Sequence, residues 1–212
     1  MHNLDQKISQ VLCRLGEQAD KERSGQATIP ESEMMLAITS DTGVYFNIML
    51  KAINAKRILE VGTSTGYSTL WFVDAIKYNN SDHAKPIITI DENPAKINRA
   101  RKNFEEAGVD SLIDVRRGTA IDVLKEMQAS YDDTPFDFVF IDADKENAIN
   151  YFDLVFPMVR TGGIIAADNI LHPENLVAEM SKYSRYVKGR PDAESVTVPI
   201  GMGEEITIKL RP

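Results

Sequence analysis

The chain has 212 residues, of which 43% are hydrophobic and 26% charged, and its formal net charge is −8. This length favours one domain, the acidic balance weighs against a general nucleic-acid binder, and no apolar run of about 18 residues predicts a transmembrane helix. Cys13 is the only cysteine, which excludes an intramolecular disulfide and a two-cysteine zinc motif. The residues before Gly25 also lack the apolar core of a signal peptide. We therefore expect a cytoplasmic protein.

The N-terminal part of the chain is expected to be helical. Apolar residues recur at helical spacing over about residues 3–24. A loop is expected over Arg23–Pro30, which contains residues that break helices. A short helix is expected over Glu31–Ile38, and Asp41 suits the N-cap of a largely buried helix that reaches Ile53.

From Lys56 onward, short apolar strands alternate with helices. The expected strands cover Arg57–Val61, Pro86–Ile90, Leu112–Arg116, Phe136–Ile141 and Ile164–Ala167. The expected helices cover Gly66–Ile76, a segment beginning at Pro94, Ala120–Met127, Asn147–Val159 and Leu176–Val187. Two last strands, Ser195–Val198 and Glu205–Leu210, flank Gly201-Met202-Gly203 as a hairpin.

This alternation predicts a doubly wound α/β fold. We expect a mostly parallel seven-stranded sheet with a C-terminal antiparallel hairpin and extra N-terminal helices. The division would be a helical extension or lid at 1–54 and an α/β core at 55–212, within a single domain. Ligands of such sheets bind beyond the carboxyl ends of the strands, where the polar residues of this chain gather.

A glycine loop follows the first strand. Gly62 and Gly66 have the spacing G-x-x-x-G, which is neither a dinucleotide fingerprint nor a phosphate loop. Asp91 ends the second strand and can accept hydrogen bonds from both hydroxyls of a ribose. S-adenosylmethionine contains both an adenosine and a carboxylate, so the loop and Asp91 together favour this cofactor. The alternative is that the two glycines only form a turn. Glu60 interrupts the apolar strand, so we expect it to contact the cofactor, to cap the next helix or to bond nearby backbone amides.

Acidic residues follow two further strands. Asp142 and Lys145 come after the fourth strand, and Asp168 and Asn169 after the fifth. Neighbouring parallel strands would bring these side chains to one edge of the sheet. Carboxylate and amide oxygens suit Mg²⁺, Mn²⁺ or Ca²⁺, whereas the spacing of an EF-hand loop is absent. The alternative is that these acids only stabilise turns at the strand ends.

Together these segments resemble the cation-dependent O-methyltransferases, the class I S-adenosylmethionine-dependent enzymes that include catechol and caffeoyl-CoA O-methyltransferases. The resemblance runs from about Glu31 to the C-terminus. Its motifs are ILEVGTSTGYST, ITIDENP, FDFVFIDADKENAINYF, GGIIAADN and VPIGMG.

The resemblance implies roles for individual residues. Asp142, Asp168 and Asn169 match the metal ligands. Lys145 matches the general base, and we group Asp142 with it as catalytic. The positions expected to contact the cofactor are Ile38, Glu60, Gly62, Thr63, Tyr67, Ser68, Asp91, Ala120, Asp142 and Asp144.

Two segments depart from the family pattern. The metal-binding pair is followed by Ile170-Leu171-His172-Pro173, where plant enzymes have an aromatic residue and an asparagine. Gly201-Met202-Gly203 replaces the Gly-Asp-Gly of bacterial relatives. No substrate-binding residue is therefore assigned in this region.

The expected activity is methylation of a catechol-like or phenolic hydroxyl, with S-adenosylmethionine and Mg²⁺, Mn²⁺ or Ca²⁺ as cofactors. Two alternatives stay open: methylation of hydroxyuridine in tRNA, as in some bacterial relatives, and a non-catalytic S-adenosylmethionine-binding protein. Lys51, Lys56 and Arg57 would be the basic patch for RNA, but we expect them to be solvated. We expect no membrane partner, and a homodimer for which the apolar face of the first helix offers an interface.

Overall fold

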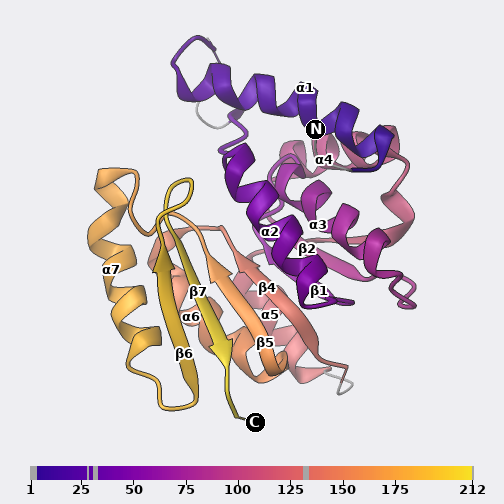
Figure 1. Ribbon diagram of the computed structural model, residues 1–212. Coiled ribbons are helices and arrows are strands. Elements are labelled where there is room, and N and C mark those ends of the chain that lie inside the picture. Colours follow the sequence, from indigo (N-terminus) through magenta and orange to yellow (C-terminus); the bar gives the residue numbers. More distant parts are fainter. Residues whose placement is uncertain (1–3, 28, 31–32, 131–133, 212) are drawn as a thin grey trace.

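The computed structural model describes residues 4–27, 29–30, 33–130 and 134–211, which form one seven-stranded sheet between two layers of helices (Figure 1). The strand order is β3-β2-β1-β4-β5-β7-β6. The first five strands are parallel, and β7 runs antiparallel to both of its neighbours. This confirms the expected fold class. The strands are β1 (Ile58–Val61), β2 (Ile87–Asp91), β3 (Ile113–Arg117), β4 (Phe136–Ile141), β5 (Val159–Ala167), β6 (Ala193–Val198) and β7 (Glu204–Lys209).

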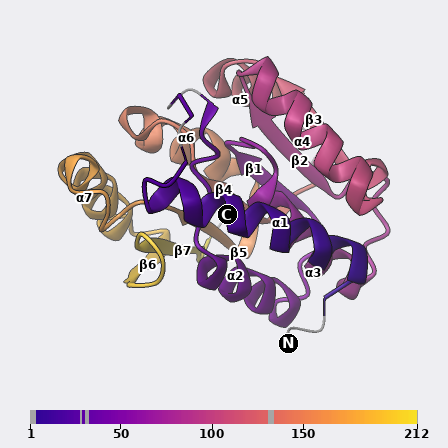
Figure 2. The ribbon, with the colours of Figure 1, turned by 90° about the horizontal axis from the view of Figure 1, so that it is seen from above.

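The sheet separates two hydrophobic cores, each covered by its own helices (Figures 1 and 2). One core is covered by α1 (Gln6–Arg23), α2 (Ser40–Ala52), α3 (Tyr67–Asn79) and α4 (Pro94–Ala107). The other is covered by α5 (Ala120–Ala129), α6 (Ala148–Val155) and α7 (Glu174–Lys188). Single 3₁₀ turns lie at Asp110–Leu112, Lys145–Asn147 and Phe156–Met158. No helix in the described ranges is long and apolar enough to span a bilayer.

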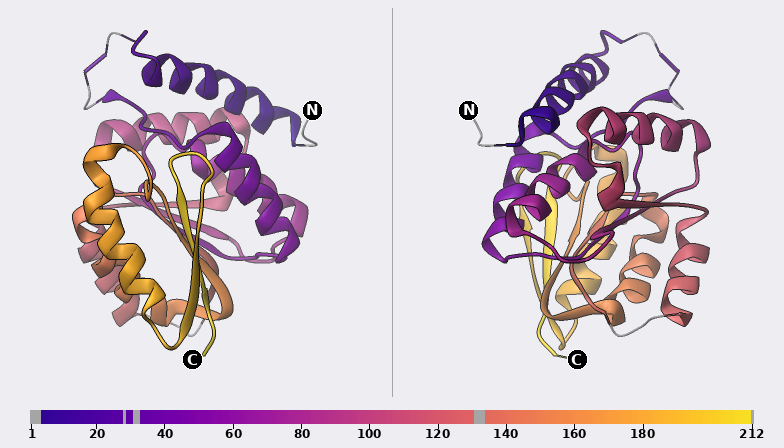
Figure 3. Two further views of the ribbon diagram at one scale, coloured as in Figure 1. Left: turned by 60° about the vertical axis from the view of Figure 1, so that its left-hand side comes forward. Right: turned by 90° about the vertical axis from the view of Figure 1, so that its right-hand side faces the viewer.

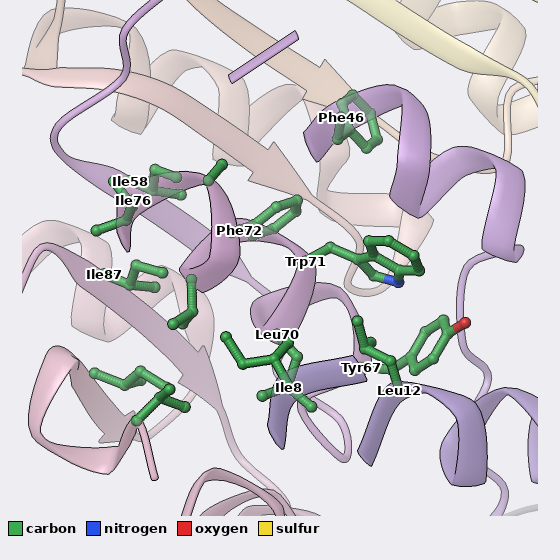
Figure 4. Packing of buried hydrophobic residues seen from close by; sticks show 14 of the residues in the cluster. Ile8, Leu12, Phe46, Ile58, Tyr67, Leu70, Trp71, Phe72, Ile76 and Ile87 are labelled. Atoms are coloured by element: carbon green, nitrogen blue, oxygen red, sulfur yellow. The ribbon is translucent and has the colours of Figure 1, made fainter. Parts of the chain in front are cut away.

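Four phenylalanines fix strand β4 against the N-terminal helices. Phe138 and Phe140 are two residues apart, so they point to the same face of the sheet. Their ring centroids lie 5.4 and 5.2 Å from Phe46 of α2, and 5.6 and 5.5 Å from Phe72 of α3. Figure 4 shows Phe46 and Phe72 from these two helices. This packing holds the end of β4, and with it the start of the acidic loop that follows.

Helix α1 packs its apolar face onto α3 and α4 of the same chain. Ile8, Leu12 and Leu15 are buried, and Figure 4 shows Leu12 beside Tyr67 and Ile8 beside Leu70. Figure 3 shows the helix across the end of the molecule opposite the C-terminus. The interface that we expected this face to offer is therefore already used within one chain. The homodimer and the division at residue 54 stay predictions.

The segment before α2 differs from the expectation. Residues 34–39 have no regular structure, and residues 31–32 of the expected short helix lie outside the described part. Side chains bind the backbone here instead: Met35 N donates to Glu22 Oε2 at 2.8 Å, and Ser64 Oγ donates to Met35 O at 2.5 Å. The N-cap of α2 is Thr39, whose hydroxyl accepts from Thr42 N, while Asp41 lies inside the first turn.

The boundary between α6 and β5 also differs. The expected helix Asn147–Val159 ends at Val155, and Val159 already begins β5, before the expected Ile164. Pro157, which cannot donate a helical hydrogen bond, lies in the 3₁₀ turn that follows α6. The expected turn at Gly162-Gly163 lies inside β5, where Gly162 has φ +76°. The register shift opposite Phe136 and Phe138 accommodates this irregularity.

Candidate active site

Three strand ends meet where the sequence predicts a site. Val61 pairs with Ile141 and Ile141 with Ala167 in parallel register, so Gly62, Asp142 and Asp168 follow side by side. Gly62 has φ +110°, and a Cβ atom there would lie 2.2 Å from the Asp142 carbonyl oxygen. Only glycine permits this approach of the two backbones.

Lys145 and Asp142 form an ion pair at this edge. Lys145 Nζ donates to Asp142 Oδ1 at 2.8 Å, and their side chains are 11% and 16% exposed. The two residues are three apart in the chain after β4, and a 3₁₀ turn, Lys145–Asn147, begins at the lysine. The structure thus brings together the two residues expected to be catalytic.

Asp168 is buried beside this pair. Its Oδ1 accepts a hydrogen bond from Asn169 N at 2.6 Å, and Asn169 has the left-handed φ of +68°. Burial, followed by repulsion from Asp142, raises the pKa of the Asp168 carboxyl. A positive charge near these carboxylates would oppose both effects.

The sequence analysis missed Glu204. Ala167 pairs with Glu205 in antiparallel register, which places Asp168 opposite Glu204. Glu204 is fully buried, and both oxygens of its carboxylate lack a hydrogen-bond donor in the described part of the chain. Burial and Asp168 raise the pKa of Glu204. In the sequence, Glu204 could be noticed only as an acidic residue at the start of an apolar strand. Its proximity to Asp168 depends on the register of β5 and β7.

The predicted ligands fit a hard divalent cation in their chemistry. Asp142, Asp168 and Asn169 offer carboxylate and amide oxygens, which Mg²⁺ prefers. The unpartnered carboxylate of Glu204 beside them is a group that a cation would stabilise. Among the residues that the structure describes, no three His, Cys, Asp or Glu side chains are arranged to hold an ion together. The metal therefore stays a prediction.

The glycine loop and Asp91 form the neighbouring part of the edge. Asp91 Oδ2 accepts from Ser64 N at 2.7 Å, and Oδ1 accepts from Asn93 N at 2.8 Å. Each carboxylate oxygen retains a further lone pair that can accept a ribose hydroxyl. Helix α3 begins after Gly66 with no side-chain cap, so its first N–H groups are suited to a polar ligand.

Glu60 lies in the core beneath this loop. Its carboxylate accepts from Ser68 Oγ at 2.5 Å, and from Thr69 Oγ1 and Thr89 Oγ1 at 2.6 Å each. Burial raises its pKa to about 7, against these hydrogen bonds, which lower it. Glu60 thus bonds hydroxyl groups, where we expected a helix cap or backbone amides, and its expected contact with the cofactor stays a prediction. Thr63 joins the same network through Thr89, at 2.6 Å between their hydroxyl oxygens.

The other residues expected to contact the cofactor lie around this edge. Ile38 is buried before α2, and Ala120 begins α5. The Tyr67 ring packs edge-on against Trp71 and beside Leu12 of α1 (Figure 4). Asp144 is exposed and accepts hydrogen bonds from Asn147 Nδ2 and the Tyr151 hydroxyl. Their contacts with a cofactor stay predictions.

The C-terminal hairpin lies against the segment that follows Asn169. Ile170 N donates to Gly203 O and Leu171 N to Met202 O, each at 2.9 Å. A Cβ atom at Gly201 would lie 2.1 Å from Thr42 Oγ1, so the hairpin turn touches the start of α2. The hairpin therefore connects the chain after Asn169 to the N-terminal helices.

Comparison with known proteins places this arrangement among methyltransferases. Residues 17–203 match the family model described as O-methyltransferase. The chain is 32% identical to a catechol O-methyltransferase of Niastella koreensis over 84% of its own length and 77% of the relative. It is 36% identical to a caffeoyl-CoA O-methyltransferase of Petroselinum crispum over 80% and 75% of the two chains.

A solved structure shares the fold. It is the O-methyltransferase TomG from Streptomyces achromogenes, involved in tomaymycin synthesis and solved in complex with S-adenosylmethionine (SAM). The TM-score is 0.77 and the identity 25%, with 98% of this chain and 91% of TomG covered.

Proposed function

The chain belongs to the O-methyltransferase family, and we propose that it methylates a hydroxyl of a small catechol-like substrate with the help of a divalent cation. As a member of this family, it is an S-adenosylmethionine-dependent O-methyltransferase. The acceptor and the cation are the proposed parts. The observation that carries them is the meeting of Asp142, Asp168 and Asn169 beside Lys145 at adjacent strand ends.

The edge between β1 and β2 is proposed to hold the methyl donor. Asp91 would accept hydrogen bonds from the ribose hydroxyls, and the N–H groups at the start of α3 would face the carboxylate. S-adenosylmethionine supplies a methyl group on a sulfonium. In the transfer, the new O–C bond forms as the C–S bond breaks, so the protein must align oxygen, methyl carbon and sulfur.

The edge between β4 and β5 is proposed to hold the acceptor. Asp142, Asp168 and Asn169 would bind the divalent cation, which when bound lowers the pKa of a hydroxyl in contact with it. Lys145, whose Nζ lies at Asp142, is proposed to take the proton of that hydroxyl when it is in its neutral amine form. The Asp168 side chain is itself buried, so its carboxyl group is largely shielded from water.

A small acceptor fits the charge of the protein better than tRNA does. The net charge of −8 repels a polyanion at long range. The basic residues considered for an RNA patch were expected to be solvated, but each has a partner within the protein. Lys51 Nζ bonds Asp74 Oδ2 at 2.7 Å, Lys56 Nζ bonds Asn80 O at 3.2 Å, and Arg57 bonds Thr134 O. Because these side chains already have partners within the protein, they are less available to bind RNA, which supports the small acceptor.

A comparison of acceptors tests the proposal. Purified protein would be given labelled S-adenosylmethionine, Mg²⁺ and either a panel of catechols or undermethylated tRNA, at physiological salt. We expect kcat/KM for at least one catechol to exceed that for tRNA. A kcat/KM for tRNA above that of every catechol would contradict the proposed acceptor.

A further inference from the structure

Glu204 is a buried acidic residue that the predicted ligand set does not include. It is the first residue of β7, and the register with β5 places it opposite Asp168. Its neighbour on the same face of the strand, Ile206, packs into the core covered by α1 to α4. The Glu204 side chain therefore faces the α2 side of the sheet, beneath the hairpin turn.

Its neighbour Glu205 shows how this strand satisfies a buried carboxylate. Glu205 is also fully buried, but it points to the other face, toward α7. It accepts from Ser195 Oγ and Thr197 Oγ1 at 2.6 Å each and from Ser184 Oγ at 2.8 Å, and Lys188 Nζ lies 3.3 Å away. Glu204 has no such donors in the described ranges.

The charges around Glu204 match a divalent cation. A carboxylate removed from water without a partner is unfavourable, and Asp168 can pair with it only through a shared proton. Asp142, Asp168 and Glu204 bring three carboxyl groups to adjacent strand ends, and a bound divalent cation would stabilise their charged forms.

We infer that Glu204 supplies the third carboxylate charge of the cation site and thereby raises its affinity for divalent metal. The inference rests on the proposed metal dependence. Because no three His, Cys, Asp or Glu side chains in the described residues are placed to hold an ion together, Glu204 acts through its charge and its position opposite Asp168.

Mn²⁺ binding to the metal-stripped full-length protein tests this inference without an activity assay. The free Mn²⁺ signal in electron paramagnetic resonance gives the dissociation constant. We expect Glu204→Gln to weaken Mn²⁺ binding roughly 10- to 100-fold, as loss of a supporting residue typically does. Glu205→Gln, the matched control on the opposite face, should bind Mn²⁺ as the unmodified protein does, and Asp168→Ala should lose binding.

Thermal unfolding gives a second readout. In chelator, Glu204→Gln should melt at or above the temperature of the unmodified protein, because it removes a buried carboxyl group that has no hydrogen-bond donor in the described part of the chain. Excess Mn²⁺ should raise the melting temperature of the unmodified protein more than that of the variant. Equal increases in the two proteins would contradict the inference.

The outcomes separate this inference from the proposed function. If Asp168→Ala loses Mn²⁺ binding and Glu204→Gln does not weaken it, the role of Glu204 is wrong and the metal site stands. If the unmodified protein binds no Mn²⁺, both are wrong. Should Glu204→Gln fail to fold, Glu204→Asp and Glu204→Asn form a pair of equal size that differs in charge. The Asp variant must then bind Mn²⁺ more tightly than the Asn variant, and equal affinities overturn the inference.

Discussion

At the scale of single residues, Lys145 is the side chain on which the proposed chemical step depends most directly. Its Nζ lies 2.8 Å from Asp142 Oδ1, and Lys145 is not among the residues expected to contact the methyl donor. Lys145→Met should therefore lower kcat by about 100-fold or more, the usual contribution of a general base. The affinity for S-adenosylhomocysteine, measured by calorimetry, should stay unchanged.

A matched control is Lys182→Met, because Lys182 is exposed on α7 and pairs only with Glu179 among the described ion pairs. Its kcat should equal that of the unmodified protein. A normal kcat in Lys145→Met would remove Lys145 from the mechanism.

Glu60 predicts how stability depends on pH. Its pKa in the folded protein is about 7, above the usual 4.5, because burial disfavours the charged form. The folded state therefore binds a proton more tightly than the unfolded state, and this contribution to stability is full below pH 4.5 and is lost as pH rises to about 7. Glu60→Gln cannot ionise, so it should lack this loss.

Urea unfolding of both proteins in chelator measures the effect. Between about pH 4.5 and pH 7, the free energy of unfolding of Glu60→Gln should rise relative to the unmodified protein by about 3 kcal/mol. Other titrating groups, such as Asp168, are present in both proteins and cancel in the difference. Parallel pH profiles would show that Glu60 keeps its ordinary pKa on folding.

At the scale of elements, the close approach of the ends of β1 and β4 at Gly62 sets the geometry of the site. A Cβ at this position would lie 2.2 Å from the Asp142 carbonyl oxygen, in addition to the strain of a φ of +110°. Gly62→Ala should thus lower the free energy of unfolding by more than the ~1–2 kcal/mol of backbone strain alone.

Gly25→Ala provides the control for that strain. Gly25 has φ +70°, but nothing lies within 4 Å of a Cβ placed there. Urea unfolding should show a clearly smaller loss of stability for Gly25→Ala than for Gly62→Ala. Similar losses would mean that the two strand ends can move apart at no cost.

The positions of the elements follow from sequence periodicity, whereas their ends depend on tertiary contacts. The strand at Phe136–Ile141 was predicted with its observed bounds, because it is almost continuously apolar. The predicted boundary between helix and strand near Pro157 was wrong. An apolar helix is followed there by an apolar strand, so no change in hydrophobicity marks where one ends and the other begins. From residue 34 to Ile38 the prediction of a short helix was wrong, because Glu22 and Ser64, far apart in sequence, bind the backbone of Met35.

At the scale of the whole molecule, the order of the strands determines what the sequence can show. Parallel neighbours end at one edge, so the proximity of Asp142 and Asp168 could be predicted from the alternation of strands and helices. Glu204 could not, because its approach to Asp168 requires the antiparallel register of β7 against β5. The partners of Glu60 were also hidden, since Thr89 comes from the neighbouring strand.

The same order would give the molecule two adjacent binding sites on one edge of its sheet. The loop after β1 and Asp91 would hold the methyl donor, and the ends of β4 and β5 would hold the acceptor. Because β1 and β4 are neighbours, the two reactants would meet at Gly62 and Asp142. Metal binding at the acceptor side is the claim on which this account depends most.

That claim is tested most directly by methyl transfer from labelled S-adenosylmethionine to a catechol, measured in chelator and again after Mg²⁺ or Mn²⁺ is restored. The account predicts an O-methylated product with metal, no product in chelator, and no response to metal in Asp168→Ala. Full activity in chelator would contradict it and would mean that the carboxylates at the strand ends are structural.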